Sequence, residues 1–373
     1  MRPFSHRSLA QRVVFGTGRA LADLLAELDR LAPAATMLIG GGRAPGLVAG
    51  LAGRIDLRWD EVAQHVPVSV AERARAAAAA HRIDTVVAVG GGSAIGLAKA
   101  VALTRPVRIV AVPTTFAGSE ATDVWGLTDE QGKQTGASDR VLPGTVIYDA
   151  ELVASLPRQL AAASGLNALA HCVDALWAPA ADPINTALAT EAMARLADGL
   201  AALAEPVAGA EPLAARQLLQ YGCYLAAVAF ASAGSGLHHK ICHVLGGRFG
   251  LPHAQTHAVV LPYVLAFNLP AAAAAGRRVA TALAGRRDAG ADPLAALLAL
   301  RTALGAPRAL AELGLAEPDL PAAVAAIAPA VPVSNPRPAG PEALRRLLHA
   351  AWAGTEPAAL STGDGPSDEG RLR

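Results

Sequence analysis

Histidine is concentrated in one short stretch of the chain. Five of the ten histidines lie within twenty residues, namely His238, His239, His243, His253 and His257. His239 and His243 are four residues apart, which places two side chains on one face of a helix, and Asn167 and His171 repeat this spacing upstream. Imidazole binds metal ions and exchanges protons near neutral pH. We therefore predict a polar catalytic site formed by His171, His239, His243 and His253.

This predicted site draws on two helices and a loop. Gly246, Gly247 and Gly250 precede His253, and we expect these glycines to return the chain toward the two helical histidines. His238 and His257 have no spacing argument, so a surface position or a hydrogen-bonded core position is an equally good interpretation of each. A lone histidine at 171 would more often be structural, but its spacing from Asn167 favours a functional role.

A glycine-rich turn, Gly90-Gly91-Gly92-Ser93, follows the apolar run Val86–Val89 and precedes a predicted helix at Ala94–Leu103. Residues without Cβ let the backbone approach a ligand closely, and a helix N-terminus offers unpaired N–H groups to an anion. We predict that Gly91, Gly92 and Ser93 contact a cofactor phosphate, with Ser93 either capping the helix or donating to the phosphate. A plain tight turn is the alternative, because the motif matches neither GxGxxG nor the Walker pattern.

A second loop, Pro113–Glu120, follows the next predicted strand and gathers hydroxyl groups beside a glycine. We predict that Thr114, Thr115 and Ser119 join the glycine turn in binding a dinucleotide, because neighbouring parallel strands end at one edge of a sheet. Ordinary turn or cap chemistry is the alternative for the two threonines. The segment Gly40–Arg43 has no carboxylate that would repel a 2′-phosphate, so the predicted cofactor is NADH or NADPH.

The elements that position these residues change in kind near residue 155. Up to that point short β-branched runs alternate with Ala/Leu segments, which is typical of an α/β unit with a mainly parallel sheet. The predicted strands are Thr36–Ile39, Thr85–Val89, Ile109–Val112 and Thr145–Tyr148. Later segments, such as Ile184–Leu203 and Leu213–Ala231, have helical periodicity. We expect a dinucleotide-binding domain over residues 1–155, an all-helical catalytic domain over 156–353, and a disordered tail over 354–373.

Composition and charge narrow the classes of function. The chain has 373 residues, of which 53% are hydrophobic, so it can bury sizeable cores and wholesale disorder is excluded. A net charge of +1 provides no field that would attract nucleic acid or an anionic membrane, which favours a small ligand. Two uncharged stretches, around 217–239 and 258–276, contain polar residues or prolines, and we expect buried helices there. Three cysteines without a CxxC motif fit a reducing compartment, and we predict a cytoplasmic protein.

Four motifs, in chain order, resemble those of the iron-containing (group III) alcohol dehydrogenase superfamily. They are the Gly90–Ser93 turn, the Pro113–Glu120 loop, the Ser164–His171 segment and the His239–His253 segment. The resemblance extends over roughly residues 12–350, and segments such as Trp125–Thr128 and Leu237–His243 resemble the maleylacetate reductase branch. It implies a dehydroquinate synthase-like fold, with an N-terminal dinucleotide-binding α/β domain followed by an all-α C-terminal domain.

The resemblance also implies a set of ligand positions. Metal-dependent members hold their ion with an aspartate and three histidines, and the matching positions here are Asn167, His171, His239 and His253, whereas His243 matches a nearby histidine that is not a ligand. The carboxamide of Asn167 cannot offset a divalent charge, so we expect no bound metal. Three imidazoles and a water molecule hold zinc in some proteins, which keeps metal binding as the alternative.

For a metal-free site, the resemblance implies that NADH or NADPH reduces the conjugated C=C bond of maleylacetate, a dicarboxylate, to give 3-oxoadipate in aromatic compound degradation. The alternatives are a metal-dependent alcohol or polyol dehydrogenase, a lyase similar to dehydroquinate synthase, and a catalytically idle nucleotide-binding protein. Lys240, one of three lysines, is turned about a hundred degrees from His239 on a helix and stays outside the catalytic set. We expect a homodimer that binds neither nucleic acid nor membrane.

Overall fold

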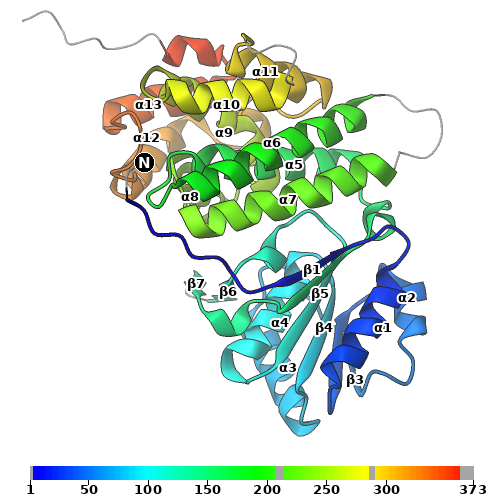
Figure 1. Cartoon of the computed structure of the whole chain (residues 1–373). Coiled ribbons are helices and arrows are strands. Elements are labelled where there is room, and N and C mark those ends of the chain that lie inside the picture. The colour runs from blue at the N-terminus through cyan, green and yellow to red at the C-terminus, as the bar shows by residue number, and fades with distance from the viewer. Residues whose placement is uncertain (1–2, 131, 206–212, 285–289, 362–373) are drawn as a thin grey trace, which may run out of the picture.

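The four short strands predicted from β-branched runs are present and lie side by side in a parallel sheet. They are β2 (Thr36–Gly40), β4 (Thr85–Gly90), β5 (Arg108–Pro113) and β8 (Thr145–Tyr148), each within one residue of its predicted limits. The structure is a computed structural model that describes residues 3–130, 132–205, 213–284 and 290–361. An α/β half and a helical half are stacked in it, as Figure 1 shows.

The sheet has six parallel strands in the order β1-β8-β5-β4-β2-β3. The two strands that the sequence analysis missed, β1 (Arg12–Phe15) and β3 (Leu57–Trp59), form its edges. Both are short and contain an arginine, so neither gave an uninterrupted apolar run. An antiparallel hairpin of β6 (Val124–Asp129) and β7 (Gly132–Ala137) was also missed, because its sequence is mostly polar or glycine.

Helices cover both faces of the sheet, which explains why its central strands are apolar throughout. On β4, Val87 and Val89 pack in the core that includes α1 (Ala20–Leu31) and α2 (Pro45–Gly50). Val86 and Ala88 point to the opposite face, where they pack with α3 (Val68–Ala80) and α4 (Gly92–Thr104). The carboxyl end of β4 is thereby held firmly where α4 begins.

The described residues from 158 to 361 contain helices and no strand, as predicted. Two buried cores organise this half, one built mainly on α5, α6 and α7 and the other on α8, α9, α12 and α13. None of the helices in the described ranges is long and apolar enough to span a membrane. The bounds are α5 (Arg158–Ala175), α6 (Pro183–Ala204), α7 (Leu213–Ala233), α8 (Leu237–Phe249), α9 (His253–Asn268), α10 (Ala273–Ala284), α11 (Pro293–Ala303), α12 (Leu320–Ile327) and α13 (Pro341–Ala353).

The predicted tail is structured at its beginning. Pro357–Leu360 forms a short 3-10 helix, and Pro357 is buried. Arg337 donates to the carbonyl oxygen of Leu360 at 2.8 Å, and Tyr263 donates to that of Thr355 at 3.1 Å. Disorder was therefore the wrong expectation for residues 354–361, while residues 362–373 lie outside the described ranges. The domain limits at 155 and 353 stay predictions.

Candidate active site

The glycine turn lies where β4 gives way to α4. Gly91 is the N-cap residue of α4, and Gly92 and Ser93 are the first two residues of the helix. No side chain caps this end of α4, so its first backbone N–H groups are available to an anion. The option that Ser93 caps the helix is wrong, because Ser93 lies inside the first turn. Its half-buried hydroxyl stays available to a phosphate.

The second loop leaves β5 directly beside the glycine turn. Gly90 is paired with Pro113 across the two strands, and the Thr114 N–H donates to the Gly90 carbonyl oxygen at 3.0 Å. A Cβ added to Gly91 would lie 2.9 Å from Thr115 Oγ1, so a larger residue would fill the space between the loops. The structure thus brings Gly91, Gly92, Ser93, Thr114 and Thr115 together, with Ser119 further along the same loop. These two loops form a cradle that is consistent with the predicted dinucleotide site. Dinucleotide binding itself stays a prediction.

The second loop also contacts the helical half. A Cβ added to Gly118, whose φ is 73°, would lie 3.0 Å from the Cβ of Ala227 on α7. Phe230, about one turn further along α7, packs against the rings of His171 and His239, with centroid distances of 4.6 and 4.3 Å. Helix α7 therefore connects the nucleotide loop with the histidines.

All four predicted catalytic histidines belong to one group of rings. His171 on α5 stacks on His239 of α8, with centroids 4.7 Å apart and ring planes 20° apart. The ring of His243 lies 5.9 Å from that of His239. His253 and His239 both contact the ring of His257, at 4.5 and 4.8 Å. With His238, whose Nε2 lies 2.8 Å from His257 Nδ1, six rings form what we call the histidine cluster: His171, His238, His239, His243, His253 and His257.

The route by which the chain reaches His253 differs from the expectation. His253 is the first residue of α9, so all six histidines of the cluster lie on three helices and none lies on a loop. Gly246 and Gly247 lie inside α8, and the return of the chain is made by Gly250, which ends α8 in the left-handed conformation at φ 70°. Glycine adopts this conformation at the lowest cost, which favours a turn at this position.

The cluster extends from the protein surface into the core. His243 and His253 are exposed and His171 is half-buried, whereas His238, His239 and His257 are at most 1% exposed. Burial lowers the pKa of His171, His238, His239 and His257 well below the ordinary histidine value, so these rings are neutral at pH 7. The exposed pair is therefore the part of the cluster that can exchange protons with solvent.

Asp174 is the functional candidate that sequence reasoning missed. It is fully buried on α5, and its Oδ2 lies 2.7 Å from His239 Nδ1. The same oxygen accepts hydrogen bonds from the backbone N–H groups of Gly236 and His239, each at 3.1 Å. Asp174 follows His171 by three residues on the same helix, and this spacing was the signal that could have identified it.

The positions that match metal ligands supply no negative charge in this chain. Asn167 supplies a neutral oxygen, and its buried Oδ1 has no hydrogen-bond partner among the described residues. Among the described residues, donor atoms within 4.8 Å of one another belong instead to His238, His239 and His257, and two of these rings are hydrogen-bonded to each other. Neither set contains a carboxylate that would neutralise the charge of the ion.

Comparisons with known proteins agree with this architecture. Residues 10–150 match the family model described as iron-containing alcohol dehydrogenase, and residues 161–352 match that of the Fe-containing alcohol dehydrogenase family, C-terminal. Maleylacetate reductase 2 of Cupriavidus pinatubonensis is 45% identical over 354 residues, which cover 93% of this chain and 96% of the relative. The similarity therefore extends over both halves of the molecule.

Solved structures give the same result. An iron-containing alcohol dehydrogenase from Corynebacterium glutamicum is 51% identical with a TM-score of 0.90, covering 97% of this chain and 100% of that one. Maleylacetate reductase from Agrobacterium tumefaciens is 36% identical with a TM-score of 0.88, covering 95% and 99%. The chain is thus an oxidoreductase that belongs to the iron-containing alcohol dehydrogenase family and, within it, to the maleylacetate reductases.

Proposed function

We propose that this enzyme reduces the carbon–carbon double bond of maleylacetate, which is conjugated to a ketone, and gives 3-oxoadipate in the degradation of aromatic compounds. The observation that carries the proposal is the histidine cluster next to a nucleotide cradle, with a carboxamide where metal-dependent relatives have a carboxylate. Such a site offers hydrogen-bond donors and proton carriers to an enone. It lacks the negative ligand that would hold a Lewis acid for the oxidation of simple alcohols.

The reaction needs one hydride and one proton. When bound, the reduced nicotinamide supplies the hydride, which adds to the alkene carbon beta to the ketone. The electron pair of the double bond moves toward the carbonyl, and negative charge collects on the ketone oxygen as an enolate. The neutral imidazole of His171 donates an N–H group that stabilises this oxygen, and the buried rings of the cluster orient the groups around it. Because burial lowers the pKa of His171, its ring stays neutral at pH 7 and acts as a hydrogen-bond donor without taking up a proton.

The proton then adds to the carbon alpha to the ketone and regenerates the carbonyl group. His243 and His253 carry this proton in the proposal, because they are the exposed members of the cluster and can be recharged from solvent. A substrate with two carboxylates also needs a cation. Lys240 is half-buried on α8 between His239 and His243, and its charge acts on His239, so we include it as a candidate partner for one carboxylate.

We propose that catalysis proceeds without a metal ion. The decisive experiment follows the absorbance of the reduced nicotinamide with freshly generated maleylacetate, before and after extended treatment with EDTA. Full activity in chelator supports the proposal. Activity that disappears with the metal and returns with iron or zinc would contradict it and favour a metal-dependent alcohol or polyol dehydrogenase.

The remaining assignments are part of the same proposal. NADH or NADPH serves as the hydride donor, because Arg43 is exposed and the Gly40–Arg43 segment carries no carboxylate that would repel a 2′-phosphate. The three cysteines are free and buried, which supports a cytoplasmic location. The protein is a homodimer that takes a small dicarboxylate substrate and binds neither nucleic acid nor membrane. Light scattering coupled to size exclusion tests the dimer, since a monomer mass at working concentration would contradict it.

A further inference from the structure

The carboxylate of Asp174 connects the beginning of α8 with one ring of the histidine cluster. Oδ2 accepts from the N–H of Gly236, the N-cap residue of α8, and from the N–H of His239 in its first turn. Oδ1 accepts from the indole N–H of Trp177 at 3.2 Å. Asp174 therefore holds both the backbone that carries His239 and the imidazole of His239 itself.

Three N–H groups besides that of the His239 ring point at the oxygens of Asp174, so the carboxylate acts as a hydrogen-bond acceptor and the contact places the His239 proton on Nδ1. With Nδ1 donating to Asp174 at 2.7 Å, the neutral ring has its lone pair on Nε2. Nε2 is buried and has no hydrogen-bond partner among the described residues. Five rings surround that of His239, so its unpartnered nitrogen lies within the histidine cluster. They are the rings of His171, Phe230, His238, His243 and His257.

We propose that Asp174 is a positioning residue of the reductase, which holds His239 in the tautomer protonated on Nδ1 and presents Nε2 to the histidine cluster as a hydrogen-bond acceptor. This inference rests on the proposed function and refines it. In this tautomer His239 orients an N–H or O–H donor, and the proton taken up by the substrate comes from another histidine.

The glycine at 236 is required by the same arrangement. A Cβ at this position would lie 2.5 Å from Asp174 Oδ1 and 2.7 Å from Asp174 Cγ. Its backbone angles of φ −87° and ψ −169° are allowed for any residue, so the space next to the carboxylate is what demands glycine. The chain thus leaves room for this carboxylate at the start of α8.

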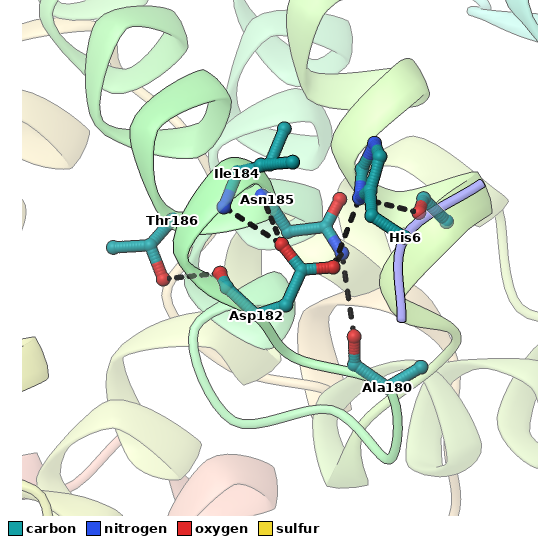
Figure 2. A network of polar contacts seen from close by, with 7 residues as sticks. His6, Ala180, Asp182, Ile184, Asn185 and Thr186 are labelled. Carbon is teal, nitrogen blue, oxygen red and sulfur yellow. Dashed lines mark hydrogen bonds and ion pairs between the residues drawn. The ribbon is translucent and has the colours of Figure 1, made fainter. Parts of the chain in front are cut away.

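The molecule contains a matched control for Asp174. Asp182 is likewise a buried helix-capping aspartate, whose Oδ1 accepts from the backbone N–H groups of Ile184 and Asn185 at 2.7 and 2.8 Å. Its Oδ2 lies 2.9 Å from the Nδ1 of His6, as Figure 2 shows. Asp182 thus makes two backbone bonds and one imidazole bond, as Asp174 does. Its imidazole partner is His6, which is not a member of the histidine cluster.

The kinetic test compares Asp174→Ala, Asp174→Asn and Asp182→Ala by stopped-flow measurement of NADH oxidation by maleylacetate. We expect Asp174→Ala to lower kcat about 100-fold, with less than about threefold change in KM. Asp174→Asn retains an oxygen that can accept from Nδ1, so it should recover part of the lost rate. Asp182→Ala should keep kcat within about threefold of the wild type, although it loses the same kinds of bonds. Equal effects of Asp174→Ala and Asp182→Ala on kcat would overturn the proposal.

A spectroscopic test does not depend on turnover. A ring N–H held by a buried carboxylate exchanges slowly and should give a proton resonance downfield of the amide region in the wild-type NMR spectrum. We expect one such signal to disappear in His239→Gln and to persist in Asp182→Ala. If no signal is lost on replacing His239, the tautomer assignment is wrong. If the signal behaves as expected but maleylacetate is not reduced, the proposed function fails while the role of Asp174 stands.

Discussion

Replacing Lys99 with methionine should change the pH dependence of stability by an amount that the structure allows us to calculate. Lys99 is fully buried on α4, where its ammonium donates to the carbonyl oxygens of Thr122 and Val124 at 2.8 and 2.7 Å. Glu120 and Asp123 attract this charge, but burial outweighs them and lowers the pKa of Lys99 from 10.5 to about 8.

The sign of the effect follows from proton binding. Because the folded pKa lies below the unfolded one, the unfolded chain holds more protons between the two values, and the free energy of unfolding rises with pH there. The charged lysine therefore destabilises the fold at pH 7, and this cost decreases as the pH increases. With pKa values of 10.5 and about 8, the contribution of Lys99 becomes more favourable by about 2 kcal/mol between about pH 7 and about pH 9.5.

Urea unfolding followed by circular dichroism, at those two pH values, measures this change. Titrating groups remote from Lys99 contribute equally to both proteins, so their contributions cancel in the comparison. We expect the wild type to gain about 2 kcal/mol relative to Lys99→Met on going to the higher pH. Val101→Ala, an uncharged buried change on the same helix, is the control and should have the same effect at both values. A wild-type-minus-variant difference that does not change with pH would refute the reasoning.

Three further predictions concern the site itself. Asn167→Asp should raise zinc affinity at least about tenfold and make turnover sensitive to chelators, because it adds a negative ligand beside imidazoles; equal zinc affinities in a competition titration would contradict this. Lys240→Met should raise KM for maleylacetate about tenfold with little change in kcat, because it removes a cation that binds a carboxylate; an unchanged KM would exclude that role. Gly91→Ala should weaken NADH binding about tenfold in a fluorescence titration, because its Cβ would lie 2.8 Å from Thr115 Cγ2, whereas Gly46→Ala, which meets nothing within 4 Å, should bind NADH normally.

The central strands and the long helices were predictable because both have strong local signals. A strand buried on both faces is a short β-branched run, and β4 and β5 therefore appear at their predicted places. The edge strand β1 depends on its pairing with β8, and its own sequence of four residues carries too little apolar pattern to indicate a strand. The same distinction applies to residues 354–361, whose order depends on Tyr263 and Arg337 far away in the chain.

For the site, residue type and spacing led to the prediction of His171, His239, His243 and His253 and of the two nucleotide loops, while the family resemblance drew attention to the neutral carboxamide of Asn167. These are chemical properties of a linear sequence, since spacing on one helix follows from helical geometry alone. Contacts between distant segments cannot be read from spacing in this way, because they depend on how whole helices pack. Tertiary structure alone decided three contacts. Asp174 of α5 contacts His239 of α8, His238 contacts His257, and the Pro113–Glu120 loop contacts α7.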